Sequence, residues 1–220
     1  MPAVLGQPAS KPRQALDRRQ WIGLAVLLVV ACVLPFVLGN YRVFQLTLAL
    51  AYAIAILGLN MLTGYNGQIS LGHGAFFAIG AYAAAILMDK AGWPYWATIP
   101  VAGLVCFIAG FLFGLPALRL EGLYLALATF ALGVAMPQIL KYKAFEHWTG
   151  GAMGVVIVKP DAPEGIPLSQ DQWLYFFTLF WVVLLFVAGW NLLRGRVGRA
   201  LVAIRDQPTP AKAMGITTGL

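Results

Sequence analysis

Long apolar runs separated by short polar clusters dominate the pattern of this 220-residue chain. Five runs contain no Asp, Glu, Lys or Arg: 20–41, 43–88, 91–118, 122–140 and 172–193. A helix crosses the ~30 Å hydrocarbon core of a bilayer with about 20 residues. The run 43–88 is long enough for two such helices, and each of the others for one. The pattern therefore predicts six membrane-spanning helices, at 21–38, 43–63, 69–88, 96–115, 122–140 and 173–193.

The polar segments divide the chain into three parts. Residues 1–19 form a polar N-terminal tail, residues 20–193 a transmembrane domain, and residues 194–220 a basic C-terminal segment. The first apolar run is too long for a cleavable signal, so we expect it to be a permanent span. The predicted fold class is all-α: a polytopic transmembrane helix bundle with both ends of the chain on one side.

Composition supports a membrane protein. Hydrophobic residues make up 60% of the chain and charged residues 10%, whereas a soluble domain carries about 25% charged residues. Both cysteines, Cys32 and Cys106, lie inside apolar runs. We expect them to be small buried hydrophobic residues rather than a disulfide or a metal pair, and we predict no metal site.

The charges predict the orientation. Six crossings place both chain ends on the same side, and positive charge marks the cytoplasmic side. On the terminal side, Asp17, Glu121 and Asp206 oppose ten basic residues: Lys11, Arg13, Arg18, Arg19, Arg119, Arg194, Arg196, Arg199, Arg205 and Lys212. Basic and acidic residues balance on the other side, so the whole net charge of +7 falls on one face. The termini are thus predicted to be cytoplasmic, and no nucleic-acid partner is needed to explain the basic character.

A glycine-rich break separates the second and third predicted spans. Irregular backbone near a bilayer is tolerated where it is buried in protein or lines a water-filled cavity, and transporters use such breaks to bind solutes. We therefore take this segment as the candidate substrate pathway: Tyr65, Asn66, Gly67, Gln68, Ser70, Gly72, His73 and Gly74. The alternative is a tight turn at the bilayer edge. On a helix Ser70 and His73 would be close enough to touch, but this spacing is poor evidence for a serine hydrolase.

The pattern of the C-terminal segment predicts a helix–turn–helix that is too short and too charged to span the membrane. Residues 199–205 have an apolar side; after the turn, Pro208 suits the first position of a second short helix and Gly215 its left-handed C-terminal residue. Two interpretations stay open: a basic amphipathic segment on anionic lipid, or a plug that docks into another protein.

Two further features carry weaker signals. The loop Thr149, Gly150 and Gly151 lies on the outer side, where it either contacts a partner, closes over the pore, or serves as a flexible connector. Small residues at a spacing of four, such as Gly110 and Gly114, predict close helix packing in lipid.

The chain has no phosphate-binding loop, since no Gly-Lys pair occurs anywhere. Acidic residues are also absent from the interiors of the predicted spans, where proton-driven carriers place them. We therefore expect no cofactor on this chain, and the energy for any active transport to come from a separate subunit.

Three motifs resemble the permease subunits of ATP-binding-cassette (ABC) importers for branched-chain amino acids, of the LivM type. The first runs from Gly64 through His73 to Tyr82. The second begins Glu121-Gly122-Leu123-Tyr124 and extends to Thr129, with the 149–151 loop after it. The third motif lies in the C-terminal segment, and the resemblance implies that its residues contact the ATPases. These residues are Gly198, Arg199, Ala200, Leu201, Ile204, Arg205, Asp206, Ala213, Met214 and Gly215.

The resemblance implies a non-enzymatic transport subunit of the bacterial cytoplasmic (inner) membrane. Its partners would be two cytoplasmic ATPase subunits that use the ATP, a second homologous permease, a periplasmic solute-binding protein and membrane lipid. Urea or short amides are alternative solutes, and a stand-alone channel or facilitator is an alternative function. Family members continue with further spans, so we expect this chain to be truncated at Leu220, and Pro208 and Pro210 depart from the family's smoother helical run.

Overall fold

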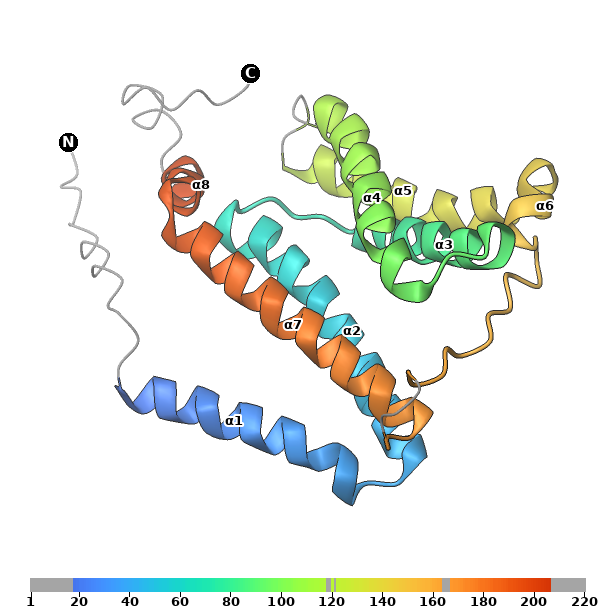
Figure 1. Ribbon diagram of the computed structural model, residues 1–220. Helices are drawn as coiled ribbons and strands as arrows, with labels where there is room; N and C mark the ends of the chain where they lie inside the picture. Colours follow the sequence, from blue (N-terminus) through green and yellow to red (C-terminus); the bar gives the residue numbers. More distant parts are fainter. Residues whose placement is uncertain (1–17, 118–119, 121, 164–166, 207–220) are drawn as a thin grey trace.

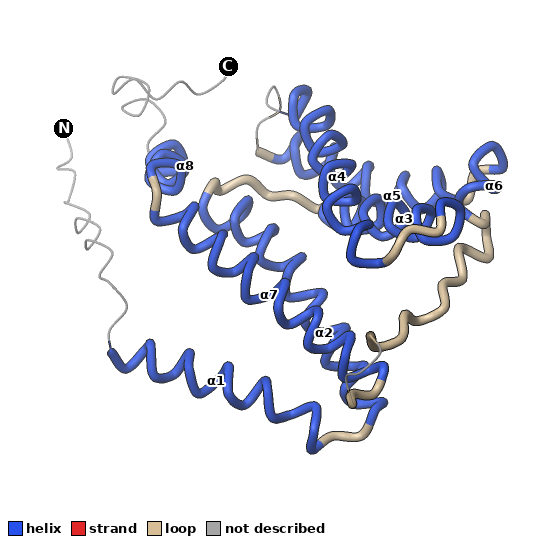
Figure 2. Tube along the Cα trace, viewed as in Figure 1, coloured by secondary structure: helices blue, strands red, loops and turns tan. Residues whose placement is uncertain are grey.

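The computed structural model describes residues 18–117, 120, 122–163 and 167–206. Within these residues all regular structure is helical (Figures 1 and 2). The elements in chain order are α1 (Arg18–Val37), α2 (Asn40–Asn60), the π-helical turn η1 (Met61–Tyr65), α3 (His73–Ala91), α4 (Tyr95–Ala117), α5 (Leu123–Leu140), the 3-10 turn η2 (Lys143–Phe145), α6 (Glu146–Thr149), α7 (Gln170–Arg194) and α8 (Arg196–Asp206).

Six helices in the described part of the chain are long and apolar enough to cross a bilayer: α1, α2 continued by η1, α3, α4, α5 and α7. Their surfaces expose large apolar side chains, for example 71% of Phe107 and 67% of Leu27. A water-soluble protein rarely exposes so much contiguous apolar surface. The predicted all-α bundle of six spans is therefore confirmed.

The helix starts differ from the predicted ones by one residue at α4 and α5, by three at α1, α2 and α7, and by four at α3. The third span was expected from residue 69 but begins at His73, because residues 66–72 form an extended connector. The last span was expected from residue 173 but begins at Gln170. There, Ser169 and Gln172 form a capping box, in which each side chain bonds the other's backbone N–H and satisfies donors at the helix start.

Helices α2 and α7 pack side by side along their length and run in the same direction (Figure 1). Gly189 of α7 lies at this contact: a β-carbon there would be 3.6 Å from the side chains of Leu57 in α2 and Met61 in η1, an ordinary van der Waals distance. Small residues drive close packing between helices in lipid, where burial of apolar surface gives no gain. This pair is the central axis of the molecule.

Helix α1 contacts α7 near one end and diverges from it elsewhere (Figure 1). The contact lies at Pro35, which has no N–H to donate to the carbonyl of Ala31. The hydroxyl of Tyr175 donates to that carbonyl at 2.8 Å, and Gln172 Nε2 donates to the carbonyl of Pro35 at 2.9 Å. Tyr175 is 2% exposed. Two polar groups of α7 therefore hold the C-terminal part of α1.

Helices α3, α4 and α5 form a second cluster. The thiol of Cys106 in α4 donates to the carbonyl of Phe76 in α3 at 3.5 Å, and a β-carbon on Gly80 would lie 3.0 Å from its sulfur. Both cysteines are free. Of the Gly110/Gly114 pair, Gly110 lies next to Phe76, whereas nothing lies within 4 Å of the position a β-carbon would take on Gly114. The small-residue spacing thus marks the α3–α4 contact at Gly110 only.

The two clusters are joined at the end where α7 begins. Trp173 Nε1 donates to the hydroxyl of Tyr95, the first residue of α4, at 2.8 Å. Phe177 packs edge-on against the Tyr95 ring at 5.2 Å between centroids. Lys159 in the preceding loop forms an ion pair with Asp171 at 2.9 Å. The opposite end of the molecule is joined by the connector between α2 and α3, drawn as a tan tube in Figure 2.

Candidate functional site

Helix α2 ends in a π-helical turn that leads into the glycine-rich break. Within this turn Thr63 Oγ1 donates to the carbonyl of Leu59 at 2.8 Å, and the backbone N–H of Gln68 donates to Leu62 O at 3.3 Å. The side chain of Asn60 lies beside Gly64, so a β-carbon there would require that side chain to move. Such π-helical turns occur frequently at functional sites. The sequence predicted a break here, but not that the helix widens before it ends.

The connector is fixed to α5 at its far end. The backbone N–H of Leu71 donates to Thr129 Oγ1 at 3.0 Å. A β-carbon on Gly72 would lie 2.6 Å from the carbonyl oxygen of Thr129, and one on Gly133 would lie 3.2 Å from the Leu71 carbonyl oxygen. The two backbones therefore touch, which only glycine at 72 allows. This contact explains why α3 starts at His73 rather than at residue 69.

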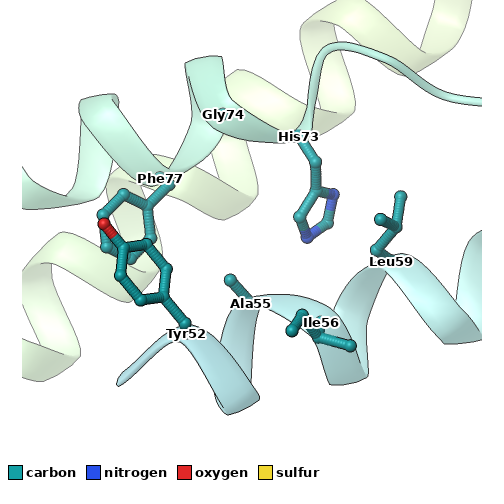
Figure 3. Close-up of a pocket in the computed structure, with 7 residues that line it drawn as sticks. All are labelled: Tyr52, Ala55, Ile56, Leu59, His73, Gly74 and Phe77. Carbon is teal, nitrogen blue, oxygen red and sulfur yellow. The ribbon is translucent and has the colours of Figure 1, made fainter. Parts of the chain in front are cut away.

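His73 begins α3 and turns its ring toward α2 (Figure 3). A β-carbon on Gly58 would lie 3.0 Å from His73 Nε2. Beside the ring is an open pocket of about 230 Å³ lined by α2 and α3. Apart from His73 and Gly74, its lining residues are Tyr52, Ala55, Ile56, Leu59 and Phe77. The surface exposed inside this pocket is apolar.

The residues predicted as a pathway are thus distributed over three places. Tyr65 ends the π-helical turn, and Asn66, Gly67, Gln68 and Ser70 lie in the connector. Gly72 lies against Thr129, and only His73 and Gly74 line the pocket. Sequence reasoning did not select Thr129 as a site residue, although it lies in the second family motif and is the only serine or threonine in the apolar run 122–140.

The suggested pairing of Ser70 with His73 has no structural basis. It required helical spacing between the two residues, and Ser70 lies in the connector, before the helix begins. Within the described residues the two side chains share no hydrogen bond, and the His73 ring faces α2. The arrangement offers no nucleophile activated by a base.

Helix α8 contains the first part of the predicted ATPase-coupling segment. It was expected over 199–205 and extends over Arg196–Asp206, with Gly198, Arg199, Ala200, Leu201, Ile204 and Arg205 inside it. The second predicted helix, with Ala213, Met214 and Gly215, lies outside the described residues. The corner between α7 and α8 depends on Gly198, because a β-carbon there would run into the backbone of Leu193.

Arg205 connects α8 to the break. Its Nη1 donates to the carbonyl of Gly64 at 2.6 Å. Gly67 has φ +73°, a left-handed conformation that favours glycine, and a β-carbon there would lie 2.6 Å from Arg205 Cγ. The structure therefore brings together two segments that the sequence suggested separately, residues 64–74 and residues 198–206.

Basic side chains surround this end of α7. Arg194 lies over the ring of Trp190 at 4.3 Å, and Arg199 Nη1 donates to the carbonyl of Arg194 at 3.2 Å. Cations next to the last carbonyls of a helix are favourable because the helix dipole is negative there. The exposed arginines make this face attractive to an acidic protein groove or to anionic headgroups.

The 149–151 loop forms a hydrogen-bonded turn. Thr149 is 5% exposed, and its hydroxyl donates to the carbonyl of Leu140 at 2.7 Å, at the end of α5. The N–H of Gly151 donates back to Thr149 Oγ1 at 3.3 Å. Gly150, Gly151 and Gly154 all have positive φ. This loop therefore closes the end of α5, and contact with a partner stays a prediction.

Together these features define a multi-pass helical membrane protein of the transporter type, with a broken helix tied to a basic amphipathic helix at one end. A family model described as the permease component of branched-chain amino acid transport systems matches residues 41–219. The chain belongs to this family of transport permeases.

Two curated relatives extend the comparison. The chain is 34% identical to the high-affinity branched-chain amino acid transport system permease protein LivM of Escherichia coli (strain K12), over 90% of this chain and 52% of the relative. The LivM protein of Salmonella typhimurium (strain LT2) matches to the same extent. The chain thus spans about half the length of the curated relatives it matches. No solved structure matched the chain.

Proposed function

We propose that this protein is a permease subunit of an ABC importer that carries branched-chain or related hydrophobic amino acids across the bacterial cytoplasmic membrane. The observation that carries the proposal is the 34% identity to LivM permeases over 90% of the chain. The six apolar helices and the basic α8 agree with this role. On this proposal the α8 end faces the cytoplasm, as the positive-inside rule requires.

The partners follow from the same proposal. Two cytoplasmic ATPase subunits bind α8 and use the ATP, a second homologous permease completes the pore, and an extracytoplasmic binding protein delivers the solute. Arg199, which is exposed on α8, provides positive charge that an acidic groove on the ATPase would accept. The chain itself binds no nucleotide, in keeping with its lack of a Gly-Lys pair.

The pocket beside His73 is our proposed part of the solute pathway. Its apolar wall suits the side chain of leucine, isoleucine or valine. All its lining residues come from α2 and α3, so the second permease would supply the missing wall. Backbone groups of the connector 66–72 would offer further donors and acceptors.

Reconstituted transport tests the proposal. The protein, its ATPases, the second permease and the binding protein are placed in proteoliposomes, and uptake of radiolabelled leucine, urea and acetamide is compared with and without ATP. Leucine uptake is expected only with ATP and only when this protein is present. Uptake without any ATPase would indicate a facilitator, and uptake of urea or acetamide alone would overturn the assignment of the solute.

A further inference from the structure

Residues 64–72 are held at both ends by polar contacts from other helices; we call this segment the strap. At one end the Arg205 guanidinium of α8 donates to the Gly64 carbonyl at 2.6 Å. At the other, Thr129 of α5 accepts a hydrogen bond from the Leu71 N–H at 3.0 Å. Few other segments connect the α8 end of the α2–α7 pair with the α3–α5 cluster (Figure 2).

Both attachments are close enough to transmit a displacement. A hydrogen bond from a charged donor is shorter and stronger than one between neutral groups, and the stem of Arg205 also covers Gly67, where a β-carbon would lie 2.6 Å from its Cγ. At the other end the Gly72 backbone touches the Thr129 backbone. Both ends are in direct contact with their neighbours, so a shift of α8 has to move the strap or break a contact.

The strap also leads directly to the pocket. His73 follows Gly72, begins α3 and lines the pocket with Gly74 and Phe77. Across the pocket stands α2, whose π-helical end carries Gly64. A shift at Arg205 therefore changes the distance between the start of α3 and α2. This distance sets the width of the pocket.

We propose that the strap couples α8 to the solute pathway, with Arg205 and Thr129 as the positioning residues at its two ends. This inference rests on the proposed function, because it assigns the route by which an ATPase bound to α8 opens or closes the pocket. Arg205 then acts inside the permease, and its main task is to transmit the motion of α8. Thr129 has the same task although it is distant from α8 in the sequence.

The test compares transport with ATP hydrolysis in the reconstituted importer. Arg205→Ala removes the contact with Gly64, and Thr129→Val removes the acceptor for Leu71 at nearly constant volume. Each variant is expected to co-purify with the ATPases and to hydrolyse ATP, while leucine uptake per ATP hydrolysed falls about tenfold. Arg205→Ala loses a charge-assisted hydrogen bond, and Thr129→Val leaves the Leu71 N–H without its acceptor. Because both act on one strap, the double variant is expected to be no worse than the poorer single variant.

Matched controls use the same residue types. Arg42→Ala removes an exposed arginine from the first turn of α2, at the end of that helix away from α8, and Thr178→Val removes a hydroxyl that bonds only the Leu174 carbonyl of its own helix. Both are expected to transport as the wild type does. The proposal would be overturned if Arg205→Ala and Thr129→Val kept the wild-type uptake per ATP. It would also be overturned if the losses of the two single variants multiplied in the double variant. Loss of the ATPases from Arg205→Ala would also overturn it, since Arg205 would then be a docking residue.

Failure of the proposed function gives a different result. In that case the wild-type complex itself shows no ATP-dependent leucine uptake, whatever the variants do. If the wild-type complex transports leucine and both variants keep the wild-type uptake per ATP, only the proposal about the strap is contradicted. The two proposals are thus separated within one set of measurements.

Discussion

At the scale of single residues, one hydroxyl satisfies a backbone carbonyl that a proline has left without a donor. Pro35 cannot donate to Ala31 O, and within a bilayer no water is present to replace the missing bond. Tyr175 reaches across from α7 and donates to this oxygen at 2.8 Å. Its hydroxyl therefore both fixes α1 and removes the cost of a proline inside a membrane helix.

The variant Tyr175→Phe tests this role. It keeps the ring and leaves the Ala31 carbonyl without a donor, so we expect the protein to lose about 1–3 kcal/mol of stability. The loss is measured from thermal or denaturant unfolding in detergent micelles. Tyr52→Phe is the matched control, because Tyr52 is 52% exposed and its ring stacks on Phe77. Equal stability of Tyr175→Phe and the wild type would show that the hydrogen bond contributes nothing.

At the scale of elements, the sequence predicts the existence of the six long helices but not all of their ends. The lengths of the apolar runs are enough to predict the membrane-spanning helices, since the thickness of the bilayer fixes how long each helix must be. The start of α3 depends on Thr129, a residue 58 positions further along the chain that bonds Leu71. Such a contact leaves no periodic pattern in the sequence, whereas the capping box of Ser169 and Gln172 is a local sequence pattern that marks a helix start.

The same limit applies to the site. Glycines between apolar runs identified the break, and the basic amphipathic pattern identified α8. These two segments touch through Arg205 and Gly64. Their contact depends on the packing of α7 against α2, which patterns in a single sequence do not encode. Family resemblance gave the residues of each motif without the contact between them.

The corner between α7 and α8 supplies a prediction at this scale. In Gly198→Ala the new β-carbon would lie 2.6 Å from Leu193 Cα, so α8 has to move away from the end of α7. We expect faster tryptic cleavage after Arg199 and Arg205 in membrane vesicles opened to the α8 side. Gly103→Ala in α4 is the control, since nothing lies within 4 Å of its β-carbon position. An unchanged cleavage rate in Gly198→Ala would show that the corner tolerates a side chain.

At the scale of the whole molecule, the described helices form two clusters joined at both ends. The Trp173–Tyr95 hydrogen bond joins them where α7 begins, and the strap joins them where α7 ends. Basic residues gather at the second of these ends, which agrees with the orientation predicted from charge. The account requires that α8 and the strap lie in the cytosol and that the loop after α6 lies outside.

Accessibility of single cysteines from either side of the membrane tests this requirement most directly. Cys32 and Cys106 are replaced by Ala, and a cysteine is placed at Met153, which is 95% exposed, or at Val197, which is 50% exposed. With a membrane-impermeant maleimide, we predict that Met153→Cys is labelled in intact spheroplasts and Val197→Cys only after permeabilisation. Labelling of Val197→Cys in intact spheroplasts would place α8 outside the cell and contradict the account.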